Sequence, residues 1–432
     1  MELRPGYKET EIGVIPEDWD VQGLLSTVRI ATGQVDPKVA PFDEMPLIAP
    51  DHIESGTGRL LETRTARQQN AISGKYLFSA GDIVYSKIRP YLRKAILAEF
   101  GGLCSADMYP LRPELGVSGR YILDNLLAHR FTKYAESVSV RSGMPKINRV
   151  ELADFRIPLP KPPEQKAIAE ALSDVDASIA ALSQLIAKKR DLRQGVMQRL
   201  LTGQARLPGF TAPWQEKRLG DHVTFLKNGI QSRAQLTLDD PVRYLHYGDI
   251  HVSADISLNL RENAMPRLPL RAAAGLTRLQ DGDIIFVDAS EDLNGVGKSL
   301  EVTGAQGIEA VSGQHTIAAR FDKTVLVDGY KCYLQFMPSF TAHLRRLAAG
   351  TKVYATNRKH IASAELRLPE TDEQVAIARV LSDMGAEISV LDARLDKTRA
   401  LKQAMMQALL TGSVRLPVTR DPAPQTKEAA YV

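Results

Sequence analysis

Apolar residues recur at alternating steps of four and three in two stretches of the chain, a spacing that lines one face of a coiled-coil helix. Each stretch covers about 38 residues, or roughly 57 Å of helix. Gly203 and Gly412 follow the last apolar positions as C-cap glycines, and a proline five residues later prevents continuation. Helices this long exceed the core of a small domain, so the pattern predicts two struts with an apolar pairing face. The expected pairing residues are Ile168, Leu172, Val175, Ile179, Leu182, Ile186, Ile377, Leu381, Met384, Ile388, Leu391 and Leu395.

The two struts are copies of one sequence. Residues 164–208 and 373–417 align without a gap at an offset of 209, and 24 of their 45 positions are identical. A repeat of this length indicates one module that was duplicated, in the order head, helix, head, helix. Two similar halves in one chain predict a pseudo-two-fold internal repeat.

The segment before each strut predicts an α+β head with many loops. Short β-branched and aromatic runs alternate with Gly, Asp, Asn and Pro. Strands are expected at Asp82–Ser86, Ile284–Val287, Ala310–Phe321 and Val325–Leu334, and helices near Tyr121–Ser137 and Gly329–Leu347. The expected boundaries are 1–160 for head 1, 161–206 for a helical spacer, 207–370 for head 2, 371–417 for a distal helical spacer and 418–432 for a flexible tail.

The two heads resemble each other only faintly. A tryptophan followed five residues later by a leucine opens both, as Trp19 and Leu24 and as Trp214 and Leu219. A Gly-Asp turn leads into an apolar strand in both, at Gly81 and at Gly282. Between these marks the heads diverge, which predicts one fold with two different surfaces.

Composition excludes several classes of protein. The chain has 432 residues, 44% of them hydrophobic and 25% charged, which are globular values. No run reaches the roughly 18 apolar residues of a membrane helix, and the N-terminus lacks a signal-type apolar core. Cys104 and Cys332 are too few for a disulfide framework, so a cytoplasmic location is expected. The net charge of +4 permits a polyanionic partner without requiring one.

No catalytic motif stands out. The chain has no P-loop, no H-E-x-x-H metal pattern and no paired C-x-x-C. The run from Gly295 to Lys298 is glycine-rich but lacks the strand-to-helix setting of a nucleotide site. His315 is a single histidine, and such residues are more often structural than catalytic.

Basic, glycine-containing loops in both heads are more informative. Lys and Arg neutralise phosphates, Arg, Asn, Gln and Lys read base edges, and glycine permits close approach of the backbone. An ordinary solvated surface remains the alternative for each single residue. The predicted DNA contacts are Lys87, Arg89, Arg93, Lys94 and Lys146 in head 1, and Lys298, Gln314, Lys352 and Arg358 in head 2.

The chain resembles the specificity subunits of type I restriction–modification systems over nearly its whole length. The opening from Gly6 to Trp19 is similar to that family. So are the segments before and within each strut: residues 157–160, 164–169 and 197–203, and again 366–369, 373–374 and 406–412. In head 2, residues 289–292 and 313–316 are also similar to the family's pattern.

The resemblance implies a non-catalytic targeting subunit. Two target-recognition domains would each read half of a bipartite, asymmetric site in double-stranded DNA. The helices would pair as an antiparallel coiled coil, set the half-site spacing and dock two methyltransferase subunits, which restriction/translocase subunits join. S-adenosylmethionine, ATP and magnesium would belong to those partners, with no cofactor and no metal on this chain.

Two other interpretations remain open from the residues alone. The chain could be a scaffold whose helices assemble protein partners and whose heads bind protein or RNA. It could also be a self-contained enzyme, although no catalytic constellation is visible. Specific binding to duplex DNA separates the first from the targeting subunit, and a methyl-transfer assay on the isolated chain tests the second.

Overall fold

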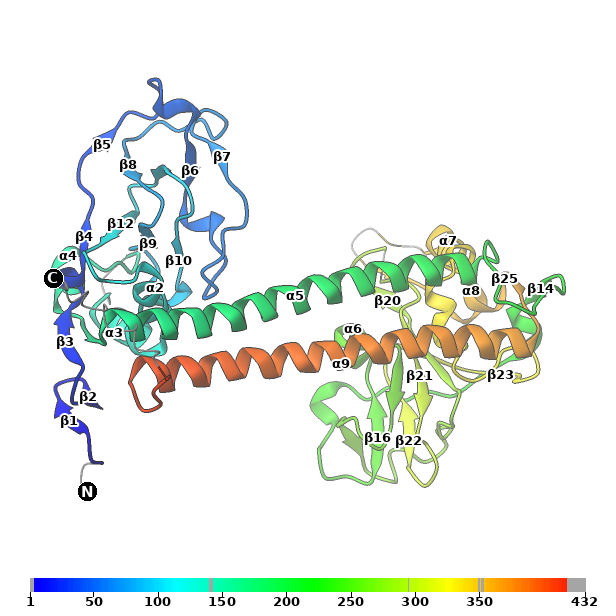
Figure 1. Cartoon of the computed structure of the whole chain (residues 1–432). Coiled ribbons are helices and arrows are strands. Elements are labelled where there is room, and N and C mark those ends of the chain that lie inside the picture. Colours follow the sequence, from blue (N-terminus) through cyan, green and yellow to red (C-terminus); the bar gives the residue numbers. More distant parts are fainter. Residues whose placement is uncertain (1–3, 140–142, 294, 349, 351–352, 418–432) are drawn as a thin grey trace, which may run out of the picture. The chain divides into compact units, whose positions relative to one another are not determined.

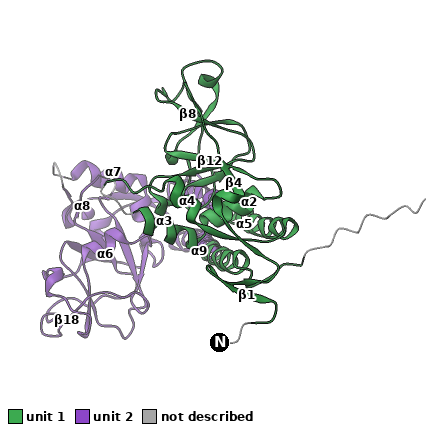
Figure 2. Cartoon of the chain, turned by 90° about the vertical axis from the view of Figure 1, so that its left-hand side faces the viewer, with its two compact units in different colours: residues 1–183, 393–432 green, residues 184–392 purple. Residues whose placement is uncertain are grey.

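The computed structural model describes residues 4–139, 143–293, 295–348, 350 and 353–417 and divides into two compact units. Unit 1 comprises residues 1–183 and 393–432, and unit 2 comprises residues 184–392 (Figure 2). Each unit therefore contains one head and part of both struts. Because this division cuts across both helices, the domain boundaries expected from the sequence remain a prediction.

The two struts are single helices of 40 residues each, α5 (Pro162–Leu201) and α9 (Thr371–Leu410) (Figure 1). In unit 1, Leu172 near the start of α5 shares a core with Leu409 near the end of α9. In unit 2, Leu200 near the end of α5 shares a core with Leu381 near the start of α9. Within each unit the helices are thus antiparallel, which confirms the expected helix pair.

The apolar seam explains this pairing. All twelve predicted pairing residues are buried or half-buried, whereas Leu192 and Leu401, beside the seam, are both 54% exposed. Polar residues extend the contact at its margins, with Lys189 Nζ 2.7 Å from Glu387 in unit 2. The basic run that contains Lys189 thus lies on a helix–helix contact. Gly203 and Gly412 have φ of 71° and 70°, the left-handed cap expected of them.

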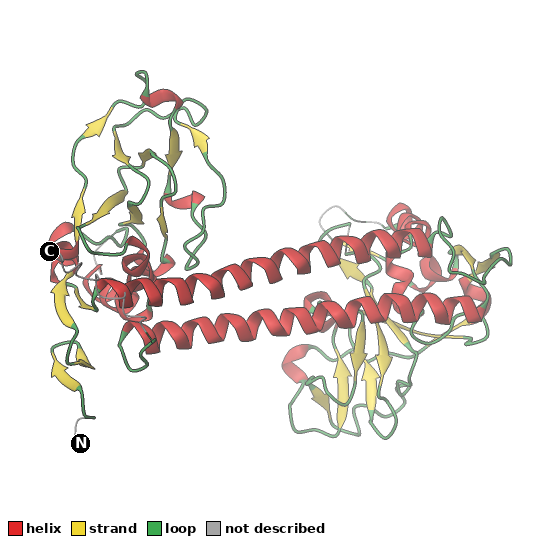
Figure 3. Cartoon of the chain, in the orientation of Figure 1, coloured by secondary structure: helices red, strands yellow, loops and turns green. Residues whose placement is uncertain are grey.

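Head 1 contains two main sheets (Figure 3). One is antiparallel, in the order β10 (Ala95–Leu97), β9 (Ile83–Ser86), β12 (Met108–Pro113) and β4 (Val28–Ile30). The other has the order β5 (Gln34–Val35), β8 (Lys75–Phe78), β11 (Gly102–Cys104), β6 (Pro46–Ile48) and β7 (Arg64–Thr65), with β11 and β6 parallel. Two further pairs are β1 (Tyr7–Thr10) with β2 (Gly13–Pro16), and β3 (Asp20–Gly23) with β13 (Arg156–Leu159). The helices of head 1 are α1 (Leu24–Thr27), α2 (Gly119–Leu127), α3 (His129–Ser139) and α4 (Arg149–Asp154).

Head 2 repeats this plan. Its larger sheet has the order β15 (Val223–Phe225), β23 (Thr316–Phe321), β19 (Ile284–Val287), β21 (Ser299–Thr303) and β17 (Ser257–Asn259). A second sheet has the order β18 (Arg267–Leu268), β16 (Val242–Leu245) and β22 (Ala310–Ser312), with β16 and β22 parallel. Two further pairs are β14 (Gln215–Arg218) with β25 (Glu365–Leu368), and β20 (Ala289–Ser290) with β24 (Tyr354–Ala355). The helices are α6 (Tyr247–Val252), α7 (Pro338–Leu347) and α8 (Arg358–Ala362).

One buried ion pair shows how closely the two heads agree. Arg112 donates to both carboxylate oxygens of Asp82 at 2.9 Å, from β12 to the turn before β9. Arg320 does the same to Asp283 at 2.7 Å, from β23 to the turn before β19. The Gly-Asp echo in the sequence therefore marks the same turn of the same sheet in both heads.

Some expected elements were wrong. The helix expected near Tyr121–Ser137 is two helices, α2 and α3, and the strand expected at Ala310–Phe321 is two strands, β22 and β23. The strand expected at Val325–Leu334 is instead a set of turns that leads into a 3₁₀ helix at Lys331–Phe336. Glu301 is the reason, because its buried carboxylate accepts the backbone N–H groups of Gly329 and Cys332 and holds that segment in a turn.

The helix expected near Gly329–Leu347 is also divided. The 3₁₀ helix ends at Phe336 and α7 starts at Pro338. Proline has no backbone N–H to continue the preceding helix and suits the first position of a new one. Within the residues that the structure describes, no helix is long and apolar enough to cross a membrane.

Candidate nucleic-acid interface

In head 1, the predicted basic residues lie on the loop that joins β9 to β10. The Ser86 N–H donates to the Lys94 carbonyl at 2.9 Å and closes this loop. Arg89 and Arg93 have φ of 48° and 46°, on either side of a 3₁₀ turn at Pro90–Leu92. The left-handed region is unusual for a residue with a side chain and occurs where the surroundings enforce it. The loop therefore presents its cations from a defined backbone shape.

A second segment of head 1 lies against this loop. The Ile147 N–H donates to the Lys87 carbonyl at 2.9 Å, and the Arg89 N–H donates to the Pro145 carbonyl at 2.8 Å. These bonds bring Lys146, which is exposed, beside the loop. The structure thus unites cations that lie more than 50 residues apart in the sequence.

The sequence analysis left Arg149 out of the predicted contacts. Its guanidinium lies 5.9 Å from the Tyr109 ring centroid, and Lys87 Nζ lies 5.2 Å from the same ring. Arg149 is the first residue of α4, and Asn148 caps that helix by accepting the Glu151 N–H. The sequence signal that could have identified Arg149 was an Asn-Arg pair at a helix start, directly after a basic loop.

Charge distinguishes this group from an ordinary protein surface. Lys87, Arg89, Arg93, Lys94, Lys146 and Arg149 form no ion pair with a carboxylate among the described residues, whereas half-buried arginines elsewhere in the chain, such as those at 112, 206, 320 and 415, do. Unpaired cations gathered on one loop system attract a polyanion and release its counterions on binding. We name these six residues the head 1 basic cluster.

Arg93 occupies a shaped place in the cluster. The Gly56 N–H donates to its carbonyl at 3.1 Å, and its guanidinium lies against the glycine itself. A Cβ on Gly56 would meet Arg93 Nη2 at 2.9 Å, and the glycine has φ of +72°. Glycine is therefore required here both by close approach and by backbone conformation.

Head 2 builds the same scaffold with other side chains. The Val287 N–H donates to the Lys298 carbonyl at 3.0 Å, as Ser86 does to Lys94. The Thr356 N–H donates to the Asp288 carbonyl at 2.7 Å, as Ile147 does to Lys87. Asn357 caps α8 as Asn148 caps α4, so Arg358 is the counterpart of Arg149.

Intramolecular bonds use more of the predicted contacts in head 2. Lys298 Nζ donates to the His251 and Ser253 carbonyls at 2.6 and 2.9 Å, at the end of α6. Exposed Arg358 donates to the Leu226 carbonyl at 2.8 Å.

Gln314 is half-buried, and its N–H donates to the Tyr244 hydroxyl at 2.8 Å. Lys352 lies outside the described residues. No observation tests the predicted DNA contacts, so they remain predictions in both heads.

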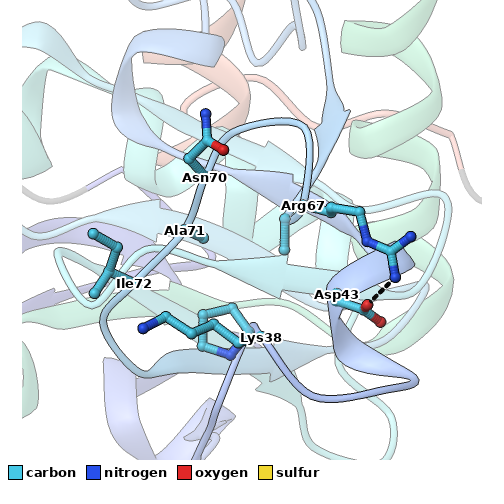
Figure 4. Close-up of a pocket in the computed structure, with 8 residues that line it drawn as sticks. Lys38, Asp43, Arg67, Asn70, Ala71 and Ile72 are labelled. Atoms are coloured by element: carbon cyan, nitrogen blue, oxygen red, sulfur yellow. Dashed lines mark hydrogen bonds and ion pairs between the residues drawn. The ribbon is translucent and has the colours of Figure 1, made fainter.

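Head 1 has a hollow of about 370 Å³, lined by residues that include Lys38, Asp43 and Arg67. Figure 4 shows these side chains. Asp43 and Arg67 form an ion pair at its wall, and the Arg67 hydrogen bond lowers the pKa of Asp43 below its ordinary 3.8. A carboxylate held ionised by arginine is a poor proton acceptor. No group of residues suited to a metal ion occurs in the described part of the chain.

Comparison with known proteins agrees with this geometry. The family model described as the type I restriction modification DNA specificity domain matches residues 17–188. The EcoDI specificity subunit of Escherichia coli is 30% identical over 213 residues, which are 48% of this chain and 46% of that protein. The chain thus matches about half the length of that relative. The putative MjaX specificity subunit of Methanocaldococcus jannaschii is 24% identical over 95% of this chain and 97% of its own length.

Solved structures share the fold. A chain from a study of complex assembly and conformational transition of the type I system aligns with a TM-score of 0.59 and 16% identity, over 93% of this chain and 99% of that one. The type I S subunit of M. genitalium aligns with a TM-score of 0.56 and 13% identity, over 95% and 98%. Duplicated α+β heads with long antiparallel helices are thus a fold that this chain shares with those structures. The family model and these relatives show that the chain is similar to the specificity subunits of type I restriction–modification systems.

Proposed function

We propose that this chain selects the DNA target of a type I restriction–modification complex, with each head reading one half of a bipartite, asymmetric site in double-stranded DNA. The observation that carries the proposal is the shared loop scaffold. The same backbone hydrogen bonds hold the β9–β10 loop of head 1 and the β19–β21 loop of head 2, but the side chains on them differ. A common frame with different side chains suits two readers of unlike sequences.

The paired helices support the proposal that half-site spacing is built into the chain. Each helix is continuous over 40 residues and packs against the other helix along an apolar seam within each unit. Changing the number of residues in α5 and α9 together should therefore change the number of unread base pairs between the half-sites.

Docking of two methyltransferase subunits on these helices is part of the proposal. Leu192 and Leu401 occupy the same position in the two copies, and both are 54% exposed. A large apolar side chain in water at equivalent places favours two equivalent contacts with a partner. Restriction/translocase subunits would join through that assembly.

The chemistry is proposed to belong to those partners. The described residues of this chain contain neither a metal-binding group nor a recognised catalytic motif. As the resemblance implies, S-adenosylmethionine, ATP and magnesium would bind to the partner subunits, and this chain would have a targeting role in the cytoplasm.

Exchange of one head tests the proposal directly. The chain is co-produced with its methyltransferase subunits, and DNA methylation is mapped across a genome that carries them. Replacing residues 207–370 with the second head of another specificity subunit should change one half of the recognised site and leave the other half and the spacing unchanged. A recognised sequence that does not change would refute the assignment, and so would methylation by the chain without partners.

A further inference from the structure

In head 2, Asp288 and His315 occupy backbone positions that correspond to those of Lys87 and Asp107 in head 1. The Asp288 N–H donates to the His315 carbonyl at 3.2 Å, and the Lys87 N–H donates to the Asp107 carbonyl at 3.0 Å. Asp288 and Lys87 also accept the equivalent N–H groups from the segment before α8 and α4. His315 in head 2 therefore stands where Asp107 stands in head 1, and Asp288 stands where Lys87 stands.

The ring of His315 is held in one orientation. Its Nδ1 lies 3.3 Å from Asp288 Oδ1, and the ring meets Tyr247 edge-on, with centroids 5.4 Å apart and planes at 85°. Asp288 Oδ1 is buried and has no hydrogen-bond partner among the described residues. The ring of His315 therefore lies between an aromatic ring and a buried carboxylate oxygen that lacks a donor.

The backbone at His315 is also unusual. Its φ is 56°, in the left-handed region, directly before β23 begins at Thr316. The other left-handed residues with side chains are Asn70, Arg89 and Arg93 in the described chain, and both arginines belong to the head 1 basic cluster. Such conformations gather at binding sites, where the surrounding structure maintains them. The conformation thus marks a constrained turn that is hydrogen-bonded to the β19–β21 loop.

The free edge of the ring has a defined chemistry. A neutral imidazole donates from one nitrogen and accepts at the other, and the partner of the first fixes the tautomer. The tautomer with its proton on Nδ1 is favoured, because it supplies a donor to the buried Asp288 Oδ1, which otherwise has none, and this tautomer leaves Nε2 as an acceptor. The side chain is 52% exposed, and Nε2 has no hydrogen-bond partner within the described residues. In the major groove, the matching donors are the exocyclic amino groups of adenine and cytosine.

We infer that His315 reads one base of the half-site bound by head 2, with its Nε2 accepting a hydrogen bond from an exocyclic amino group, and that Asp288 is the positioning residue that sets its tautomer. This inference rests on the proposed function. It adds a base-contacting residue that the search for basic residues did not identify. Lys and Arg only donate hydrogen bonds, whereas an amino group of a base needs an acceptor on the protein.

The test uses the complex of the full chain with its methyltransferase subunits. His315→Gly removes the side chain and suits the left-handed backbone, so the fold should be kept, which thermal unfolding verifies. Discrimination at one base pair of the head 2 half-site should fall by roughly 5- to 160-fold, the equivalent of one base contact. The half-site of head 1 should be unchanged, and so should every position in His129→Ala, which removes an exposed histidine elsewhere.

An atom deletion in the DNA identifies the contact. At the relaxed position, a base analogue without the exocyclic amino group should cost the parent complex the same factor and cost His315→Gly nothing. Asp288→Asn should weaken discrimination at that same position without lowering the temperature of unfolding. Full discrimination by His315→Gly, an even loss at all positions, or equal sensitivity of both proteins to the analogue would overturn the inference while leaving the proposed function in place. A parent complex without any specific target would refute the proposed function instead.

Discussion

The guanidinium of Arg415 holds the carboxylate of Glu164, 251 residues earlier in the chain, with Nη2 2.7 Å from Oε2. Trp19 Nε1 donates to the same oxygen at 2.9 Å, and Arg415 also donates twice to Asp18 at 2.9 Å. The segment after α9 is thus bound to the start of α5 and to the first strands of head 1. Residues near both ends of the described chain thus contact each other in unit 1.

Unit 2 contains the same arrangement within a continuous stretch. Arg206 donates to Glu373 at 2.6 Å, and Trp214 Nε1 donates to it at 3.1 Å. Arg206 and Arg415, like Glu373 and Glu164, are separated by the repeat offset of 209. The duplication therefore produced the same contact of arginine and tryptophan with a buried glutamate at the start of each long helix.

Removing Arg415 should destabilise unit 1. Glu164 is only 4% exposed, and a buried carboxylate that loses its cation is costly, so Arg415→Ala should lower the free energy of unfolding by about 3–5 kcal/mol. Urea unfolding followed by circular dichroism measures the change. Arg399→Ala on the exposed side of α9 should cost less than about 0.5 kcal/mol. Equal effects of the two variants would show that the contact between Arg415 and Glu164 does not stabilise unit 1.

The apolar seam should tolerate truncation very unevenly. Leu172 and Leu381 are fully buried, so either change to alanine should cost about 2–5 kcal/mol. Leu192 and Leu401 have the same side chain and are more than half exposed, so their change to alanine should cost under about 1 kcal/mol. The same urea measurement compares all four. If Leu192 or Leu401 proved as costly as Leu172, the assignment of the seam would be wrong.

The stability of unit 1 should depend on pH through the titration of Asp124. Its side chain is fully buried, and this burial raises its pKa to about 6 from the ordinary 3.8, although Arg120 opposes the shift from 3.2 Å. Arg120 also pairs with Asp176, which Lys402 of α9 contacts at 2.6 Å. Between these two pKa values, the folded protein retains a proton that the unfolded chain has lost. The stability that this proton provides is fully present below pH 3.8 and is lost as pH rises through about 6.

Asp124→Asn mimics the protonated form and should remove this dependence. The free energy of unfolding of the parent relative to the variant should fall by roughly 1–3 kcal/mol between pH 4 and pH 7. Urea titrations at several pH values provide the measurement. Parallel pH profiles of the two proteins would show that Asp124 does not change protonation in this range.

Removing cations from the head 1 basic cluster should weaken DNA binding evenly across sequences. Lys146→Ala and Arg149→Ala should each reduce the slope of log affinity against log salt by about 1, because each lost phosphate contact retains one counterion. Fluorescence anisotropy of the complex with its methyltransferase subunits, over a series of salt concentrations, checks this. Lys166→Ala on exposed α5, which pairs only with Glu170, is the matched control and should leave the slope unchanged. A slope that is equally unaffected in all three variants would exclude the cluster from the interface.

Local signals in the sequence were sufficient for the duplicated plan and the two long helices. A heptad pattern repeats every two turns and needs no distant partner to be visible, and the two C-cap glycines mark helix ends by their own conformational freedom. The pairing face could therefore be named residue by residue. The strand expected at Val325–Leu334 failed because its apolar residues suit several elements, and distant Glu301 decided the outcome.

The binding surface depended on tertiary structure. The sequence showed that both heads carry basic loops, but it could not show that Lys298 caps α6 or that Arg149 lies beside Lys87 over Tyr109. The correspondence between Lys87 and Asp288 could not be predicted from the sequence either. It is defined by backbone hydrogen bonds, which do not depend on the identity of the side chain. Periodic patterns and caps act between neighbours along the chain, so the sequence alone determined the helices and their duplication. Hydrogen bonds between segments tens of residues apart form only after folding, so only the tertiary structure decided which side chains meet on each head.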